Sequence, residues 1–200
     1  MDLGRVALRG IVGPLFVGHG TQKLFGWFGG HGLEATGGAF ESMGLRPGRQ
    51  KATAAGMAET AGGVLITLGA LTPVAAAAVS GTMITAIRKA HINNGPWVTN
   101  GGYEYNLTII GACLALTETG PGSPSVDAAL FPKLKGSRLA LLALAAAAAG
   151  SYLATSDRLL KGEAAEGEGR IDQVPSDPSV AEPDRKFTRE GVQTAPGQHT

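Results

Sequence analysis

Residues 53–90 read TAAGMAETAGGVLITLGALTPVAAAAVSGTMITAIRKA, two apolar stretches that meet at the pair Thr72-Pro73. Proline suits the first turn of a helix, because its missing N–H would find no partner there. Each stretch approaches the roughly 20 apolar residues with which a helix crosses a bilayer core about 30 Å thick. We therefore predict two antiparallel membrane helices, residues 53–71 and 74–90, joined by a tight turn.

Three further apolar segments flank this hairpin, at residues 3–28, 103–116 and 138–153. Charged residues make up 16% of the chain, whereas soluble domains have about 25%. We predict an all-α fold, in which residues 1–130 form an integral membrane four-helix bundle. A linker and a fifth transmembrane helix are expected in residues 131–155.

The last part of the chain has a different composition. From residue 156 onward, Asp, Glu, Arg, Pro, Ser and Gly dominate and aromatic residues nearly vanish. Such a segment has too little apolar surface to offset the entropy that it would lose on ordering. We predict a disordered charged tail over residues 156–200.

Composition also argues against several kinds of function. The formal net charge is +1, so the chain lacks the basic footprint of a nucleic-acid-binding protein. Its one cysteine, Cys113, lies in an apolar run and cannot form a disulfide or a paired-thiol relay within the chain. No closely spaced ligand pair, such as the two histidines of HExxH, occurs, so we predict no metal site.

Polar and ionisable residues gather at the ends of the predicted helices. Antiparallel helices alternate in direction, so the end of the first, the start of the second, the end of the third and the start of the fourth meet at one membrane face. A charge near the membrane interior is costly, so such residues usually face the bundle or a wet cavity. The predicted cluster comprises His19, Gln22, Lys23, Glu59, Arg88, His91, Tyr103 and Glu104.

Spacing and charge suggest how part of this cluster is arranged. His19, Gln22 and Lys23 should share one helix face, because residues three and four apart are neighbours on a helix. Glu59 is expected to pair with Lys23 or Arg88. Glu104 is expected to pair with a neighbouring base or with His19.

A different role fits some residues near the same ends. Long basic side chains reach toward lipid headgroups, and aromatic residues form belts at membrane interfaces. We favour this interpretation for Lys89, Trp27 and Trp97. It also stays open as an alternative for Lys23 and Arg88.

Small residues recur every fourth position on both helices of the central hairpin, an arrangement that lets membrane helices approach closely. We expect these faces to contact each other, although a glycine-rich chain also produces such spacing by chance. The loop at residues 29–51 is too long for a bare turn, and a short helix is expected to begin near Leu33. The small residues are Ala54, Ala58 and Gly62 in the first helix, and Ala77, Gly81 and Thr85 in the second.

Three motifs occur in a fixed order: HGTQKLFGWFGG at residues 19–30, AETAGG at 58–63 and NGGYEYNL at 100–107. In this order they resemble the DoxX family of small bacterial membrane proteins, over residues 3 to about 130. The resemblance implies a multi-pass bundle in the bacterial cytoplasmic membrane. The positions that it matches are His19, Gly20, Gln22, Lys23, Gly26, Glu59, Gly62, Gly63, Gly102, Tyr103 and Glu104.

The resemblance also implies a link to quinone-based redox chemistry, since relatives are similar to the membrane subunit of thiosulfate:quinone oxidoreductase. Other family-like members are tied to oxidant defence beside a superoxide dismutase and a sulfurtransferase. We therefore expect a quinone-interacting subunit that needs a protein partner, because the chain has no evident electron carrier. In this hypothesis His19, Gln22, Lys23 and Tyr103, with Arg88 and His91, contact the quinone, while Glu59 and Glu104 relay protons.

Two other functions are compatible with the same residues. The chain would act without catalysis if the polar network merely fixed the bundle and the tail recruited soluble enzymes. It would act as a transporter if a small solute crossed through the polar end, which four short helices could enclose only as a homo-oligomer.

Overall fold

The computed structural model describes residues 2–156, and within them every regular element is a helix. The predicted all-α class is confirmed. The predicted tail at residues 156–200 lies outside the described residues, apart from Ser156. The α-helices are α1 (Leu3–Phe25), α2 (Gly32–Ser42), α3 (Gly48–Leu68), α4 (Thr72–Ala86), α5 (Glu104–Thr119), α6 (Val126–Leu130) and α7 (Ser137–Thr155).

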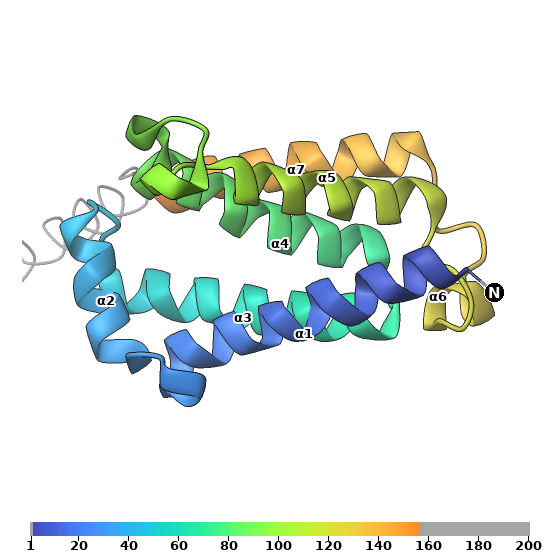
Figure 1. Cartoon of the computed structure of the whole chain (residues 1–200), viewed down its shortest axis with the longest axis horizontal. Coiled ribbons are helices and arrows are strands. Elements are labelled where there is room, and N and C mark those ends of the chain that lie inside the picture. The colour runs from blue at the N-terminus through green and yellow to red at the C-terminus, as the bar shows by residue number, and fades with distance from the viewer. Residues whose placement is uncertain (1, 157–200) are drawn as a thin grey trace, which may run out of the picture. The chain divides into compact units, whose positions relative to one another are not determined.

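Five long helices alternate in direction and lie in two layers (Figure 1). In one layer α1 packs along α3, and in the other α4 packs against α5 and α7. The α3–α4 hairpin joins the layers, while α2 lies across one end of the bundle and α6 lies at the other. The fifth predicted helix is thus an integral part of the bundle, because α7 packs along α4 and α5.

The predicted segments match these helices, but several ends are displaced. The first helix stops at Phe25 because Gly26 takes a left-handed conformation with φ +72°, and a separate 3₁₀ turn follows at Trp27–Gly29. The second begins at Gly48, five residues before its predicted start, because a polar first turn precedes its apolar part. A π-helical turn, Ile87–His91, prolongs the third helix beyond Ala86.

The connections hold two further short helices. The helix expected near Leu33 is α2, which begins at Gly32. The helix α6 was not predicted, since its five residues are too few to show a hydrophobic period.

Among the described helices, α7 alone passes a test of both length and hydropathy for a membrane span. The 15 and 16 residues of α4 and α5 are fewer than the roughly 20 of a usual span. Charged and glycine residues lower the mean hydropathy of α1 and α3, which are long enough.

A continuous apolar core lies between the two layers near the middle of the bundle. Phe16 from α1, Ile66 from α3, Val79 from α4 and Leu116 from α5 are each at most 2% exposed. Cys113 is buried in the same core. This core joins the two layers between the polar end of the bundle and the end that holds α6.

Two helices approach closely at α1 and α3, where glycines recur seven residues apart on each. A Cβ atom at Gly20 would lie 2.5 Å from the carbonyl oxygen of Gly56, and one at Gly63 would lie 2.6 Å from that of Gly13. Backbone thus touches backbone at two levels. Of the two glycines in the expected small-residue contact within the central hairpin, Gly62 meets Val79 of α4, whereas Gly81 meets Ala147 of α7.

We expect Gly20→Ala to lower the free energy of unfolding by about 1–3 kcal/mol, because the added methyl group meets rigid backbone. Gly18→Ala is the matched control, since a Cβ at Gly18 meets nothing within 4 Å. The control should be neutral or stabilising by up to about 1 kcal/mol, the difference in helix propensity. Denaturant unfolding in mild detergent, followed by circular dichroism, measures both variants. Equal effects would contradict the packing described here.

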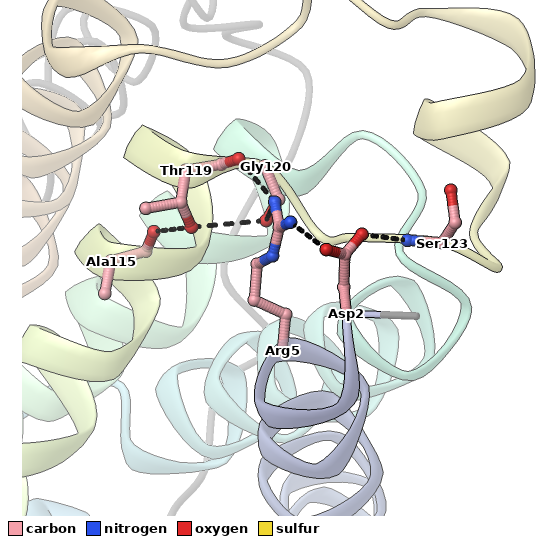
Figure 2. A network of polar contacts seen from close by, with 6 residues as sticks. All are labelled: Asp2, Arg5, Ala115, Thr119, Gly120 and Ser123. Atoms are coloured by element: carbon pink, nitrogen blue, oxygen red, sulfur yellow. Dashed lines mark hydrogen bonds and ion pairs between the residues drawn. The ribbon is translucent and has the colours of Figure 1, made fainter.

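The end of the bundle that holds the N-terminus is tied by a polar network (Figure 2). Arg5 forms an ion pair with Asp2, and its Nη1 donates to the carbonyl oxygen of Thr119 at 2.8 Å. The backbone N–H of Ser123 donates to Asp2 at 2.9 Å. This hydrogen bond and the nearby Arg5 lower the pKa of Asp2 below its ordinary value of 3.8. The start of α1 is therefore fastened to the end of α5.

A buried carboxylate closes the α3–α4 turn at the same end. Asp127 of α6 is 1% exposed and accepts hydrogen bonds from the backbone N–H groups of Leu71 and Thr72, each at 2.8 Å. The hydroxyl of Thr72 donates a third bond at 2.6 Å, and the N–H of Asp127 donates to the carbonyl of Gly69. Asp127 thereby caps the N-terminus of α4 from a distant part of the chain.

Candidate functional site

An ion pair joins the two helices of the first layer. Lys23 Nζ of α1 lies 2.6 Å from Oε2 of Glu59 in α3. Side chains on a helix lean toward its N-terminus, so Lys23 reaches back along α1 to the middle of α3. The Glu59 side chain is 5% exposed and that of Lys23 is 25% exposed. Of the two partners expected for Glu59, Lys23 is the correct one.

This pair lies on the wall of a large cavity between the layers. The cavity has a volume of about 760 Å³, within the range of roughly 300–1,000 Å³ typical of ligand sites. Its wall is mostly apolar and includes Phe16 of α1, Phe40 of α2 and Met83 of α4. Further parts of the wall come from α3 and the loop before it, the π turn, the loop before α5, α5 itself and α7.

A few polar groups interrupt this apolar wall. Asn106 of α5 is 5% exposed, and its Nδ2 donates to the Sδ of Met83 at 3.3 Å. A thioether is a weak acceptor, so this amide is available to a better one. The imidazole of His19 lies against the Phe16 ring, with ring centroids 6.0 Å apart, and reaches the cavity from an exposed position on α1.

The predicted cluster gathers at one end of the bundle, as the alternation of helix directions requires (Figure 1). Four of its eight members line the cavity, and four lie beside it. The lining members are His19, Lys23, Glu59 and His91, while Gln22, Arg88, Tyr103 and Glu104 are not part of the wall.

The members beside the cavity have partners of their own. Gln22 Nε2 donates to the carbonyl of Phe28 at 3.2 Å, so it turns away from Lys23. Arg88 reaches Ser151 at 3.4 Å. The pairing expected for Glu104 is wrong, because its Oε1 accepts the backbone N–H of Val98 at 2.8 Å and so folds the loop before α5.

Comparison with protein families gives a match over residues 4–92, to the family model DoxX. This part of the chain is similar to the DoxX family. The DoxX match covers α1 to α4 and both members of the Lys23–Glu59 pair. It ends before α5, so the motif at residues 100–107 lies outside it. No curated protein and no solved structure matches the chain.

The DoxX match and α7, the one described helix that qualifies as a span, together indicate a membrane protein of the DoxX type. The cavity, however, extends beyond the DoxX match. Asn106, Tyr105 and Ser151 line it from α5 and α7. Within the second layer, α4 lies inside the DoxX match, whereas α5 and α7 line the cavity with residues that the family model does not describe.

Sequence reasoning missed several polar members of the cavity wall, among them Asn106, Tyr105 and Lys89. Asn106 lies in the quoted motif NGGYEYNL, and the sequence signal for it was a lone amide in the first turn of an apolar helix. Tyr105 lines the cavity although Tyr103 was chosen, because residues two apart on a helix point about 200° apart around its axis. Lys89, assigned to the headgroup region, also lines the cavity.

Proposed function

We propose that this chain is a multi-pass protein of the bacterial cytoplasmic membrane that binds a quinone and serves a redox complex. The observation that carries the proposal is a mostly apolar cavity of about 760 Å³ whose wall holds one partly buried ion pair, Lys23–Glu59. A quinone is an apolar ring with two carbonyl acceptors, so it matches an apolar space with a few donors.

The outer faces of the helices support the membrane location. Helices of soluble bundles present polar residues to water. Here each of the five long helices exposes at least one large apolar side chain, as lipid contact would require. These include Ile11 and Leu15 of α1, Val64 and Leu68 of α3, Val74 of α4, Leu107 of α5, and Leu141 and Leu142 of α7.

The ends of the bundle support it as well. Trp27, Phe28 and Trp97 are more than half exposed at the end where the polar cluster gathers. Aromatic side chains in such positions are typical of membrane interfaces. The cavity would then begin near the headgroups and extend toward the bilayer interior.

Two cavity groups can donate hydrogen bonds to quinone carbonyls. Lys23 uses one of its three ammonium donors on Glu59, and Asn106 has only a sulfur acceptor among the described residues. Glu59 is placed to receive or deliver a proton through Lys23 as the ring charge changes. Quinone reduction also needs two electrons, which a partner redox protein would supply.

The resemblance to the DoxX family suggests the class of partner. We propose an oxidant-defence or sulfur-metabolism enzyme, such as a superoxide dismutase or a sulfurtransferase, held at the membrane by this chain. Affinity purification in mild detergent, with identification of co-purifying proteins and extracted quinone, tests the partner and the ligand together.

We expect Lys23→Ala and Asn106→Ala each to weaken quinone binding at least about tenfold, because each removes a donor from a largely apolar site. Glu59→Gln keeps the shape of the side chain and should weaken binding while the protein stays folded. Gln22→Ala is the control. Gln22 is next to Lys23 in the sequence, but its side chain bonds to the carbonyl of Phe28 and does not line the cavity. Fluorescence titration of purified protein with a quinone analogue measures affinity. Unchanged binding in both donor variants would exclude this site.

A further inference from the structure

The cavity does not end at its polar groups but continues as a groove along the side of the bundle. The floor of this groove is α4, and its walls are α3 and α7. It is lined by small residues, which are Ala54 and Ala58 of α3, Ala77 and Gly81 of α4, and Ala146 and Gly150 of α7. Ala54, Ala146 and Gly150 are exposed, so the groove opens sideways.

The groove is long and has no free polar group along its floor. The cavity wall follows α4 from Val74 to Ala86, about 18 Å at 1.5 Å per residue. That exceeds half of a bilayer core about 30 Å thick. The hydroxyls of Thr82 and Thr85 donate to the carbonyls of Val79 and Gly81 within α4.

Continuity with the polar end decides what kind of molecule fits. A ligand there must combine a polar head at Lys23–Glu59 with a slender apolar chain along α4, because one cavity contains both regions. A second helix, roughly 10 Å wide, could cover the groove but could not follow it inward to the ion pair. A flexible hydrocarbon chain attached to the head group can occupy both.

We propose that this groove holds the isoprenoid tail of the quinone and that the molecule reaches the site sideways from the lipid, between α3 and α7. This inference rests on the proposed function and adds the tail, its path and its direction of access. The small side chains of the groove leave room for the methyl branches of such a tail.

Four substitutions test the path of the tail. Gly150→Phe and Ala146→Phe place a bulky side chain at the groove from α7, and a Cβ atom at Gly150 meets nothing within 4 Å. Gly111→Phe and Ala145→Phe are the matched controls. Gly111 likewise has open space around it, both control residues are exposed, and neither lines the cavity.

The probes are one quinone ring without a tail and the same ring with a long isoprenoid tail, titrated against purified protein in detergent. We expect both groove variants to weaken binding of the tailed quinone at least about tenfold. The bulky side chain would occupy the space of the tail, so the tail would lose buried apolar contacts with the groove. Binding of the tail-less quinone should change by less than about twofold, which shows that the head site is intact. Both controls should bind like the unmodified chain.

Other outcomes separate this inference from the proposed function. If the unmodified chain binds the tail-less quinone and the groove variants still bind the tailed one normally, the tail path is wrong and the head site stands. Equal loss of both quinones would also refute the groove as a tail site. If native mass spectrometry shows Gly150→Phe releasing a phospholipid while quinone binding persists, the groove holds a lipid instead. If the unmodified chain binds neither quinone, both proposals fail.

Discussion

Replacing Glu59 by leucine is expected to lower the free energy of unfolding by about 3 kcal/mol, because it leaves the Lys23 ammonium in an apolar cavity without its partner. The residue Glu59 is 3% exposed, and its carboxylate lies 2.6 Å from Lys23 Nζ. Breaking one side of a buried pair costs more than the pair contributes, since the remaining charge keeps its desolvation penalty. Denaturant unfolding in mild detergent measures the loss.

The double variant Lys23→Met/Glu59→Leu separates stability from function. With both charges replaced by apolar side chains of similar volume, stability should return to within about 1 kcal/mol of the original or exceed it. Quinone binding should nevertheless remain lost, because the ammonium donor is gone. A double variant as unstable as Glu59→Leu would show that the two residues act independently. A stable double variant that still binds quinone would leave the pair a structural role only.

The fold could be predicted largely from segment lengths and hydropathy, because five apolar stretches with short connections leave few arrangements. Alternation of direction then placed the polar ends together, and charge complementarity indicated Lys23 as one of two partners for Glu59. These steps use only sequence order and helix period. They do not require knowledge of how any two helices are rotated against each other.

The finer features depend on that rotation, and there the prediction was incomplete. The glycines in backbone contact are Gly13 and Gly20 of α1 with Gly56 and Gly63 of α3, seven residues apart, whereas the sequence suggested the four-residue repeats of α3 and α4. Small residues show that another helix can approach closely. They do not show which helix that is. For the same reason Gly81 meets Ala147 of α7 instead of α3.

The orientation of single side chains limited the prediction of the site in the same way. Gln22 was placed with Lys23 on one face, yet the turn after α1 supplies the carbonyl of Phe28 and draws the amide toward it. Glu104 likewise bonds to the backbone of Val98 in the preceding loop. Polar side chains at helix ends have unsatisfied backbone groups close by, and these compete with long-range partners. Asp127 gave no signal at all, because its loop has no period to interpret.

Asp127→Ala is expected to lower the free energy of unfolding by about 3 kcal/mol. The substitution removes the acceptors of three hydrogen bonds, at Leu71 N–H, Thr72 N–H and Thr72 Oγ1, and the two donors of Thr72 are buried. Removing a helix cap alone costs about 0.5–2 kcal/mol, and each buried donor without a partner adds about 1–3 kcal/mol. Water that enters the widened turn offsets part of that sum.

Two further variants show whether the loss comes from the cap on α4 or from α6 itself. Asp127→Asn keeps one amide oxygen as an acceptor, so it should cost roughly half as much as alanine, about 1–2 kcal/mol. Ser125→Ala removes the local cap of α6, where the Ser125 hydroxyl accepts from the N–H of Ala128 at 3.2 Å. That local cap should contribute about 1 kcal/mol or less. If Ser125→Ala cost as much as Asp127→Ala, the folding of α6 would be the essential element, and the carboxylate would not be what holds the start of α4 in place.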